Sequence, residues 1–342
     1  MPARTAFVFG GKTIAAGDRR TIDLPVSVLS DHTPVTMSAH VIHGRRNGPT
    51  MFVSSGIHGD EVIGVEIVRR LLRMANLSSL RGTLIVVPIV NTFGFINHSR
   101  YLPDRRDLNR CFPGSVGGSL AARLAHLLAR CSVGIDLHSA AVHRTNLPQI
   151  RVSSGSQNAM VLAKVFGAHV ILTSPVRDGS LRGSAEKSGV DMLLYEAGEG
   201  LRFDEMAVRA GVAGILRVMR HLEMLPATGI ARAKSASVMC ASSKWIRAPM
   251  GGLLRAYKRR GDVVTAGETL GAVSDPFGER ETAIVAPFSG IIIGRAVLPI
   301  VNEGDAVFHL AAVKSNDTAE AAVDDLTAQL EADPLFDEDE II

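Results

Sequence analysis

The sequence predicts an α/β domain with a mostly parallel or mixed sheet, followed by a small all-β domain. From about Thr50 to Glu223, short apolar runs alternate with segments whose hydrophobic residues recur at helical spacing. After Pro226 the helical spacing disappears, glycine becomes frequent, and a short motif is repeated. Because 342 residues is long for one hydrophobic core, we expect one domain over residues 1–230, a β domain over 236–313 and a tail over 314–342.

Within the first domain, apolar runs of strand length alternate with helical segments. Thr83–Val90 is nearly all apolar, as expected of a strand buried on both faces, with Pro88 near its end. A helix is expected over Glu61–Met74, because its apolar residues fall on one face. The other expected strands are Thr50–Ser55, Val133–His138, His169–Thr173 and Met192–Tyr195, and the other expected helices are Leu120–Ala129, Asn158–Phe166 and Glu205–Met224. The residues before Thr50 are expected to add further strands with antiparallel pairing.

The second domain contains an internal repeat. The segment APMGGLL from Ala248 is echoed by APFSGII from Ala286, which predicts a pseudo-symmetric β barrel-sandwich. This half resembles the lipoyl and biotinyl carrier fold. The segment Ser274–Thr282 lacks the Met-flanked lysine that such carriers need, so a prosthetic group is not expected.

Composition excludes several classes of protein. Hydrophobic residues make up 46% and charged residues 21%, as in ordinary globular proteins. No signal-peptide run and no stretch of transmembrane length is found, so we expect no membrane association. The odd, widely spaced cysteines Cys111, Cys131 and Cys240 imply no disulfide framework, and a cytoplasmic location is expected. A homo-oligomer is compatible with the sequence.

The net charge of +3 conceals an asymmetry. Residues 314–342 contain ten acidic residues and one basic one, which leaves 36 basic and 24 acidic residues in the body, about +12. The basic residues are scattered and not interleaved with aromatic ones, so nucleic-acid binding is not expected and a small anionic substrate is favoured. We expect Asp317–Glu340 to be a solvated appendage.

Two segments at expected strand ends carry candidate metal ligands. His58 and Glu61 lie in a GIHGDE segment, at a strand-to-helix turn, where an imidazole and a carboxylate can converge on a cation such as zinc. His138, in DLHS, would supply a third ligand, with Asp136 on the same side of its strand. His143 is the competing ligand, and an acidic helix cap is the alternative for the first segment. Three protein ligands leave a coordination position open for water, as in catalytic zinc sites.

A third segment, DLNR, carries candidate substrate ligands. Asn109 and Arg110 can hold a substrate carboxylate or polarise the carbonyl under attack. Arg100 and Arg105 precede them, and surface ion pairs are the alternative reading of all these arginines.

A fourth segment, EAGEG, ends an apolar strand. A carboxylate there suits a general base beside a metal-activated water. Glu196 is nearer the strand than its rival Glu199, and we expect it to be the base.

Together these segments resemble the succinylglutamate desuccinylase and aspartoacylase family, within the zinc carboxypeptidase-like superfamily. The matching pieces are GIHGDE, DLNR followed by Phe112-Pro-Gly, DLH and EAG, in the family's order, and the pattern covers roughly Thr50–Met224.

The resemblance implies one Zn²⁺ per chain on the three candidate ligands, with Glu196 as the acid/base and with Asn109 and Arg110 contacting substrate. An arginine before the DLNR segment also contributes in this family. Arg100, followed by tyrosine, matches best, and Arg105 is the alternative. The appended β domain resembles the family's module that can narrow the entrance to the site.

The function expected from these observations is zinc-dependent hydrolysis of the amide bond of a small N-acylated amino acid or similar metabolite. The first alternative is a metallocarboxypeptidase that acts on a peptide or peptidoglycan fragment with the same residues. The second is a non-catalytic scaffold, which would have no need of the candidate ligands and base.

Overall fold

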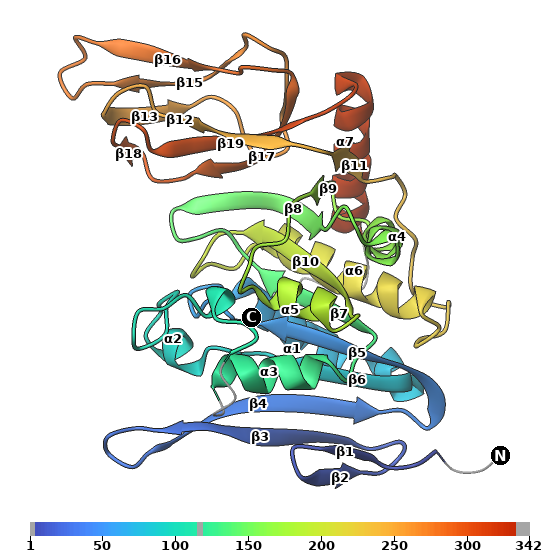
Figure 1. The fold of residues 1–342 in the computed structure, drawn as a ribbon. Coiled ribbons are helices and arrows are strands. Elements are labelled where there is room, and N and C mark those ends of the chain that lie inside the picture. The colour runs from blue at the N-terminus through green and yellow to red at the C-terminus, as the bar shows by residue number, and fades with distance from the viewer. Residues whose placement is uncertain (1–3, 115–118, 333–342) are drawn as a thin grey trace.

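A long mixed β-sheet organises the computed structural model, which describes residues 4–114 and 119–332 (Figure 1). In sheet order its strands are β12 (Ser243–Arg247), β19 (Ala306–Ala312), β17 (Gly290–Ala296), β8 (Arg144–Val152), β10 (Asp191–Gly198), β7 (Val133–His138), β5 (Arg46–Ser55), β6 (Arg81–Val87), β4 (Pro34–His43) and β3 (Arg19–Val28). The central strands β10, β7, β5 and β6 are parallel, whereas β8 and β4 are antiparallel to their inner neighbours. The prediction of a mixed α/β sheet is therefore confirmed.

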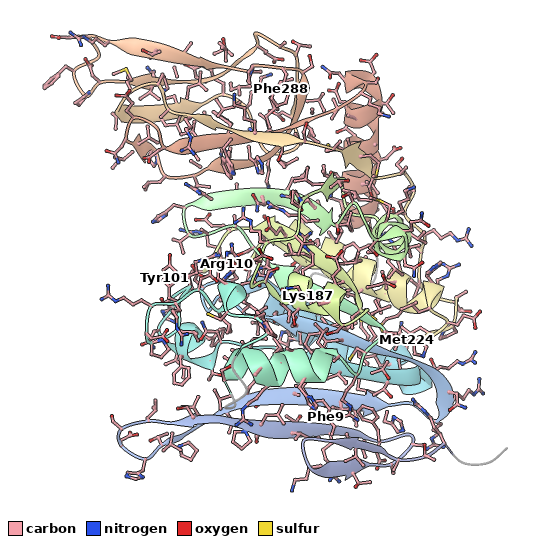
Figure 2. The ribbon with its side chains drawn as sticks, viewed as in Figure 1. Phe9, Tyr101, Arg110, Lys187, Met224 and Phe288 are labelled. Atoms are coloured by element: carbon pink, nitrogen blue, oxygen red, sulfur yellow. The ribbon has the colours of Figure 1, made fainter. Side chains whose placement is uncertain are left out.

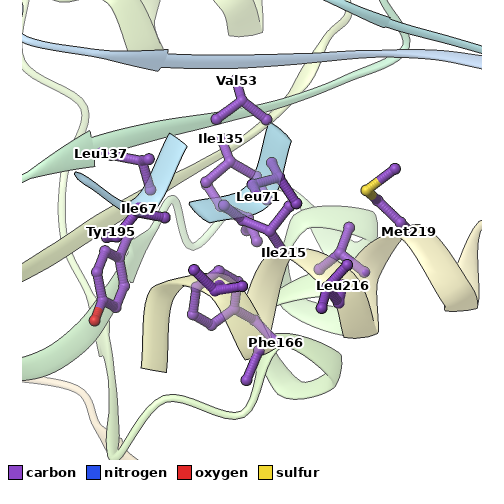
Figure 3. Packing of buried hydrophobic residues seen from close by; sticks show 14 of the residues in the cluster. Val53, Ile67, Leu71, Ile135, Leu137, Phe166, Tyr195, Ile215, Leu216 and Met219 are labelled. Carbon is purple, nitrogen blue, oxygen red and sulfur yellow. The ribbon is translucent and has the colours of Figure 1, made fainter. Parts of the chain in front are cut away.

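Helices cover both faces of this sheet. On one face lie α1 (Ile63–Arg73), α4 (Gln157–Phe166) and α6 (Glu205–His221), and on the other lie α3 (Leu120–Leu128) and α5 (Leu181–Lys187). Figure 3 shows Ile67 of α1 and Ile215 of α6 packed near Ile135 of the sheet, all of them fully buried. Burial of both faces explains the nearly continuous apolar runs of the central strands.

The remaining elements are short strands, one short helix and two 3₁₀ turns. They are β1 (Phe7–Phe9), β2 (Lys12–Ile14), α2 (Thr92–Ile96), β9 (Val170–Thr173), β11 (Val238–Cys240), β13 (Gly252–Ala256), β14 (Val263–Val264), β15 (Thr269–Ser274), β16 (Glu281–Val285) and β18 (Ile300–Val301), with short 3₁₀ turns at Ala75–Ser79 and Leu108–Arg110. Strands β16, β15, β13 and β18 form a second sheet, so the part of the chain after residue 236 is rich in β structure. Within the described ranges, no helix has the length and apolarity needed to cross a membrane.

Most expected elements of the first domain lie within a few residues of the observed ones, but α2, β8 and α5 were not predicted. Arg144, Asn146, Pro148 and Arg151 interrupt the apolar pattern of β8. The strand forms because β10 and β17 pair with it, one on each side. Tertiary pairing therefore overrides a weak local signal.

The first half of the acidic segment is not the solvated appendage that the sequence predicted. Residues Asn316–Glu331 form α7, whose side chains at Val323, Leu326 and Leu330 are buried. Leu330 joins the core beneath α6, and the Gln329 side chain bonds the backbone of residues 232 and 234. The acidic residues face outward from a helix that belongs to the fold, while the rest of the expected appendage lies outside the described residues.

Candidate active site

The turn between β5 and α1 brings His58 and Glu61 beside the end of β7. Ser54 of β5 pairs in parallel with Asp136 of β7, so both strands end at one edge of the sheet. Gly59 lets the turn approach helix α2, because a Cβ there would lie 1.9 Å from the carbonyl carbon of Gly94. As a result, the imidazole rings of His58 and His138 lie 5.1 Å apart between centroids.

His58, Glu61 and His138 form a buried cluster whose ligand atoms all lie within 4.8 Å of one another. The Glu61 carboxylate lies between the two rings, with Oε1 2.6 Å from His58 Nδ1 and Oε2 2.8 Å from His138 Nδ1. Each of the three residues is only 3% exposed. The structure therefore brings together all three metal ligands expected from the sequence.

A carboxylate stands behind each imidazole. Asp136 Oδ2 lies 2.7 Å from His138 Nε2, and Asp107 Oδ1 lies 3.2 Å from His58 Nε2. Such partners fix the orientation of a ligating ring and leave its other nitrogen to face the metal. Two imidazoles and one carboxylate, with Nδ1 of both rings turned to the cluster, are a suitable donor set for catalytic zinc.

The same contacts shift the ionisation of the cluster. Burial alone would raise the pKa of Glu61, but the two imidazoles hold that pKa below its ordinary value. Burial would lower the pKa of His58 and of His138, yet Glu61 and the carboxylates behind the rings raise both values. The cluster thus attracts positive charge, and protons and a cation compete for the same nitrogen atoms.

Arg100, and not Arg105, reaches the cluster. Its Nη1 lies 3.4 Å from Glu61 Oε1 and its Nη2 lies 3.0 Å from Asp107 Oδ2, and the side chain lines the adjoining cavity. Arg105 is exposed and does not line that cavity.

Asn109 and Arg110 also line the cavity, from the 3₁₀ turn that follows Asp107. The Asp107 side chain caps this turn by accepting the backbone N–H of Asn109 at 2.8 Å. Asn109 Oδ1 accepts the backbone N–H of Leu181 at 2.9 Å, whereas the Arg110 side chain remains exposed. Figure 2 shows Arg110 and Tyr101 in the same loop region.

Glu196 faces the cavity from β10, one strand away from His138, with which it is in register. Its rival Glu199 instead accepts the backbone N–H of His143 at 3.1 Å and lines a separate pocket. Neither Glu199 nor His143 lines the cavity that contains the cluster. The favoured residues Arg100, His138 and Glu196 therefore line the cavity. Their competitors, which are Arg105, His143 and Glu199, do not.

The cavity has a volume of about 690 Å³ and a strongly cationic wall. The lining includes Glu61 and Glu196 as its acidic side chains, against six arginines: Arg100, Arg110, Arg144, Arg151, Arg177 and Arg182. Arg182 is 8% exposed, and one of its terminal nitrogens has no hydrogen-bond partner within the described part of the chain. Burial and the nearby Arg151 both lower the pKa of Arg182, so an anion in this cavity would be attracted.

Sequence reasoning missed a large part of this wall. Arg144, Asn146 and Arg151 come from the unpredicted strand β8, and their polarity within an otherwise apolar strand is the signal that could have found them. Trp245 and His309 line the cavity from the C-terminal β strands, with their rings stacked at 4.5 Å between centroids. Motif spacing could not place these two residues at the site.

The fold and the buried His–Glu–His cluster define a class of α/β proteins with a candidate metal-dependent active site. Residues 47–222, just over half of the chain, match the family model described as the succinylglutamate desuccinylase/aspartoacylase catalytic domain. The chain therefore belongs to this family, as the sequence motifs predicted.

Relatives over most of the chain agree with this assignment. The N-alpha-acetyl-L-2,4-diaminobutyric acid deacetylase of Halomonas elongata is 26% identical over 309 residues, which cover 85% of this chain and 90% of that protein. A succinylglutamate desuccinylase/aspartoacylase structure from Rhodobacter sphaeroides is similar with a TM-score of 0.77 at 24% identity, covering 86% of this chain and 96% of that one. The product-bound ectoine utilization protein EutE (DoeB) of Ruegeria pomeroyi has a TM-score of 0.77 at 23% identity, with 86% and 95% covered. At these identities the two structures show a shared fold.

Proposed function

We propose that this chain hydrolyses the amide bond of a small N-acylated amino acid or similar metabolite, using one Zn²⁺ held by His58, Glu61 and His138. The observation that carries the proposal is that these three buried donors adjoin the same cavity as Glu196. Membership of the family supports it. The name of the Halomonas relative, a deacetylase of an N-acetylated amino acid, supports the substrate class.

Zinc in this donor set would act as a Lewis acid and lower the pKa of a coordinated water to about 7. Glu196 takes the proton of the attacking water and delivers it to the nitrogen of the leaving amine. The carbon–nitrogen bond breaks, and the products are a carboxylic acid and an amine. Glu196 suits this task because it is on the strand next to His138 and faces the cavity.

Arg100, Asn109 and Arg110 bind the substrate in this proposal. The Arg110 side chain is exposed to the cavity, where a planar guanidinium can hold a carboxylate by two parallel hydrogen bonds. Arg100 is engaged by Glu61 and Asp107, which places its charge nearer the reacting atoms. Six arginines against two acidic residues in the lining favour an anionic substrate.

We further propose that residues 1–230 form the catalytic unit and that residues 236–313 form a barrel-sandwich module of the lipoyl and biotinyl type. The absence of a lysine from Ser274–Thr282 argues against a carrier role. The module instead contributes Trp245 and His309 to the wall of the cavity, which narrows it for a small substrate.

The experiment that tests the proposal measures primary-amine release by zinc-loaded protein from a panel of N-acetyl, N-succinyl and other N-acyl amino acids. Release from one or a few members is the expected result. Dipeptides and peptidoglycan fragments form a second panel. Turnover confined to that second panel would assign the same site to a metallocarboxypeptidase.

A further inference from the structure

One oxygen of Glu196 is held by an ion pair and by a hydrogen bond, while the other oxygen receives no hydrogen bond within the described ranges. Arg151 Nη2 lies 2.7 Å from Glu196 Oε2, and Asn146 Nδ2 donates to the same oxygen at 3.2 Å. The two side chains differ in charge but converge on one oxygen atom. The side chain of Glu196 is 18% exposed and that of Arg151 is 22% exposed, so water screens this contact only in part.

The antiparallel pairing of β8 with β10 creates this arrangement. Arg151 pairs with Leu194 and Asn146 pairs with Gly198, so the two residues lie on either side of Glu196 along the neighbouring strand. The register of the two strands shifts between Glu196 and Gly198. The side chains of Arg151 and Asn146 both reach the Glu196 carboxylate beside this shift. Both residues are thus carried by strand β8 and not by a loop.

We infer that Arg151 and Asn146 are positioning residues for Glu196. By holding Oε2 they fix the plane of the carboxylate and leave Oε1 as the oxygen that exchanges a proton with water and with the leaving amine. A carboxylate held in one orientation is already aligned with the water that it deprotonates, so no rotamer change precedes the reaction. A displacement of about 1 Å from this position can lower the rate by about 10²-fold. The inference rests on the proposed role of Glu196 as general base.

A competing role for Arg151 is direct binding of a substrate anion, since its guanidinium lines the same cavity as Arg177 and Arg182. The position of Asn146 favours the positioning role. This neutral side chain donates a hydrogen bond to the same Glu196 oxygen that forms the ion pair with Arg151, a convergence that an anion site for substrate would not require.

The test compares Arg151→Met, Arg151→Lys and Asn146→Ala with Arg177→Met. The last variant removes the same charge from the same cavity, but Arg177 makes no hydrogen bond to Glu196 in the described structure. Arg151→Met should lower kcat by about 10²-fold with little change in KM, with partial rescue in Arg151→Lys and a smaller loss in Asn146→Ala. Arg177→Met should act mainly on KM.

A second readout does not depend on turnover. Crystal structures of zinc-loaded Arg151→Met should show the Glu196 carboxylate rotated from its wild-type position while the zinc content is unchanged. A raised KM with unchanged kcat, or a Glu196 that stays in place, would overturn the positioning role. If wild-type protein turns over no N-acyl amino acid, the proposed function fails, and the Glu196 geometry in the variant still decides this inference.

Discussion

Asp136 Oδ2 lies 2.7 Å from His138 Nε2, at the buried end of β7. Ser54 in turn donates to the other Asp136 oxygen at 2.7 Å, so the carboxylate is held between the neighbouring strand and the ring. This contact orients His138 Nδ1 toward Glu61 within the candidate metal site.

Replacing Asp136 by Asn should therefore weaken zinc binding by about 10- to 100-fold, because the ring loses its charged partner. Competition with a chromophoric chelator measures this affinity. Asp107→Asn is the matched variant behind His58, and its longer contact of 3.2 Å predicts a smaller effect. Equal zinc affinity in wild type and Asp136→Asn would show that the ring does not depend on this carboxylate.

Glu196→Gln should retain zinc and lose most turnover. The amide keeps the size of the side chain but cannot accept the proton of the attacking water. General base catalysis contributes about 10²- to 10⁴-fold, and kcat should fall by an amount in this range. Steady-state kinetics, with metal analysis of the same sample, provide the measurement. A fully active Gln variant would remove Glu196 from the mechanism.

The pKa shifts predict how pH affects the metal-free protein. The pKa values of His58 and His138 are raised above their ordinary value of 6.5 in the folded state. Their protonated forms thus contribute stability that is fully present below 6.5 and is lost as pH rises through the raised values. Because zinc must displace these protons, its stabilising effect should be larger at about pH 8 than at about pH 6. Thermal unfolding with and without zinc at both pH values tests this, and a zinc effect independent of pH would contradict it.

Helix α7 should contribute to stability despite its acidic composition. Leu330 is 4% exposed in the core beneath α6, so Leu330→Ala should lower the free energy of unfolding by about 2–4 kcal/mol. Glu320→Ala, an exposed change in the same helix, is the control and should be nearly neutral. Chemical denaturation measures both variants. Equal stability of the two variants would contradict the contribution of Leu330 burial to the stability of the fold.

Trp245 should report ligand binding, because it is the chain's one tryptophan and lines the cavity. Its ring stacks on His309, and the guanidinium carbon of Arg144 lies 5.2 Å from its centroid. A substrate or product that enters the cavity should therefore change the intrinsic fluorescence. Trp245→Phe is the control, because it removes the fluorescence of the chain's one tryptophan. If calorimetry detects ligand binding but the Trp245 emission does not change, the ligand binds outside this cavity.

The sequence was most informative where residue types suited to metal binding or acid–base catalysis lie at the ends of apolar strands. His58, Glu61, His138 and Glu196 could be found because each ends or follows an apolar strand, and neighbouring parallel strands end at one edge of a sheet. The local sequence contained the positions of these residues, and the pairing of strands brought them together.

The rest of the cavity depends on pairing between distant segments. Arg151 is positioned by the pairing of β8 with β10, and only its polarity within the strand marks it in the sequence. Trp245 on β12 and His309 on β19 reach the cavity because β19 pairs with β17 and β17 pairs with β8, and neither residue has a local signal. The prediction of a solvated appendage at α7 was wrong for another reason. It was based on the net negative charge of the segment and did not take into account the helical spacing of Val323, Leu326 and Leu330, which are buried on one face of the helix.

The most direct test of the central claim is a zinc titration of metal-free protein, followed by amine release from the best N-acyl amino acid of the panel. The account predicts that activity rises with added zinc to a plateau at one equivalent per chain, and that His58→Ala binds no stoichiometric zinc and stays inactive. Full activity in the metal-free protein, or in His58→Ala, would contradict the assignment of this cluster as the catalytic metal site.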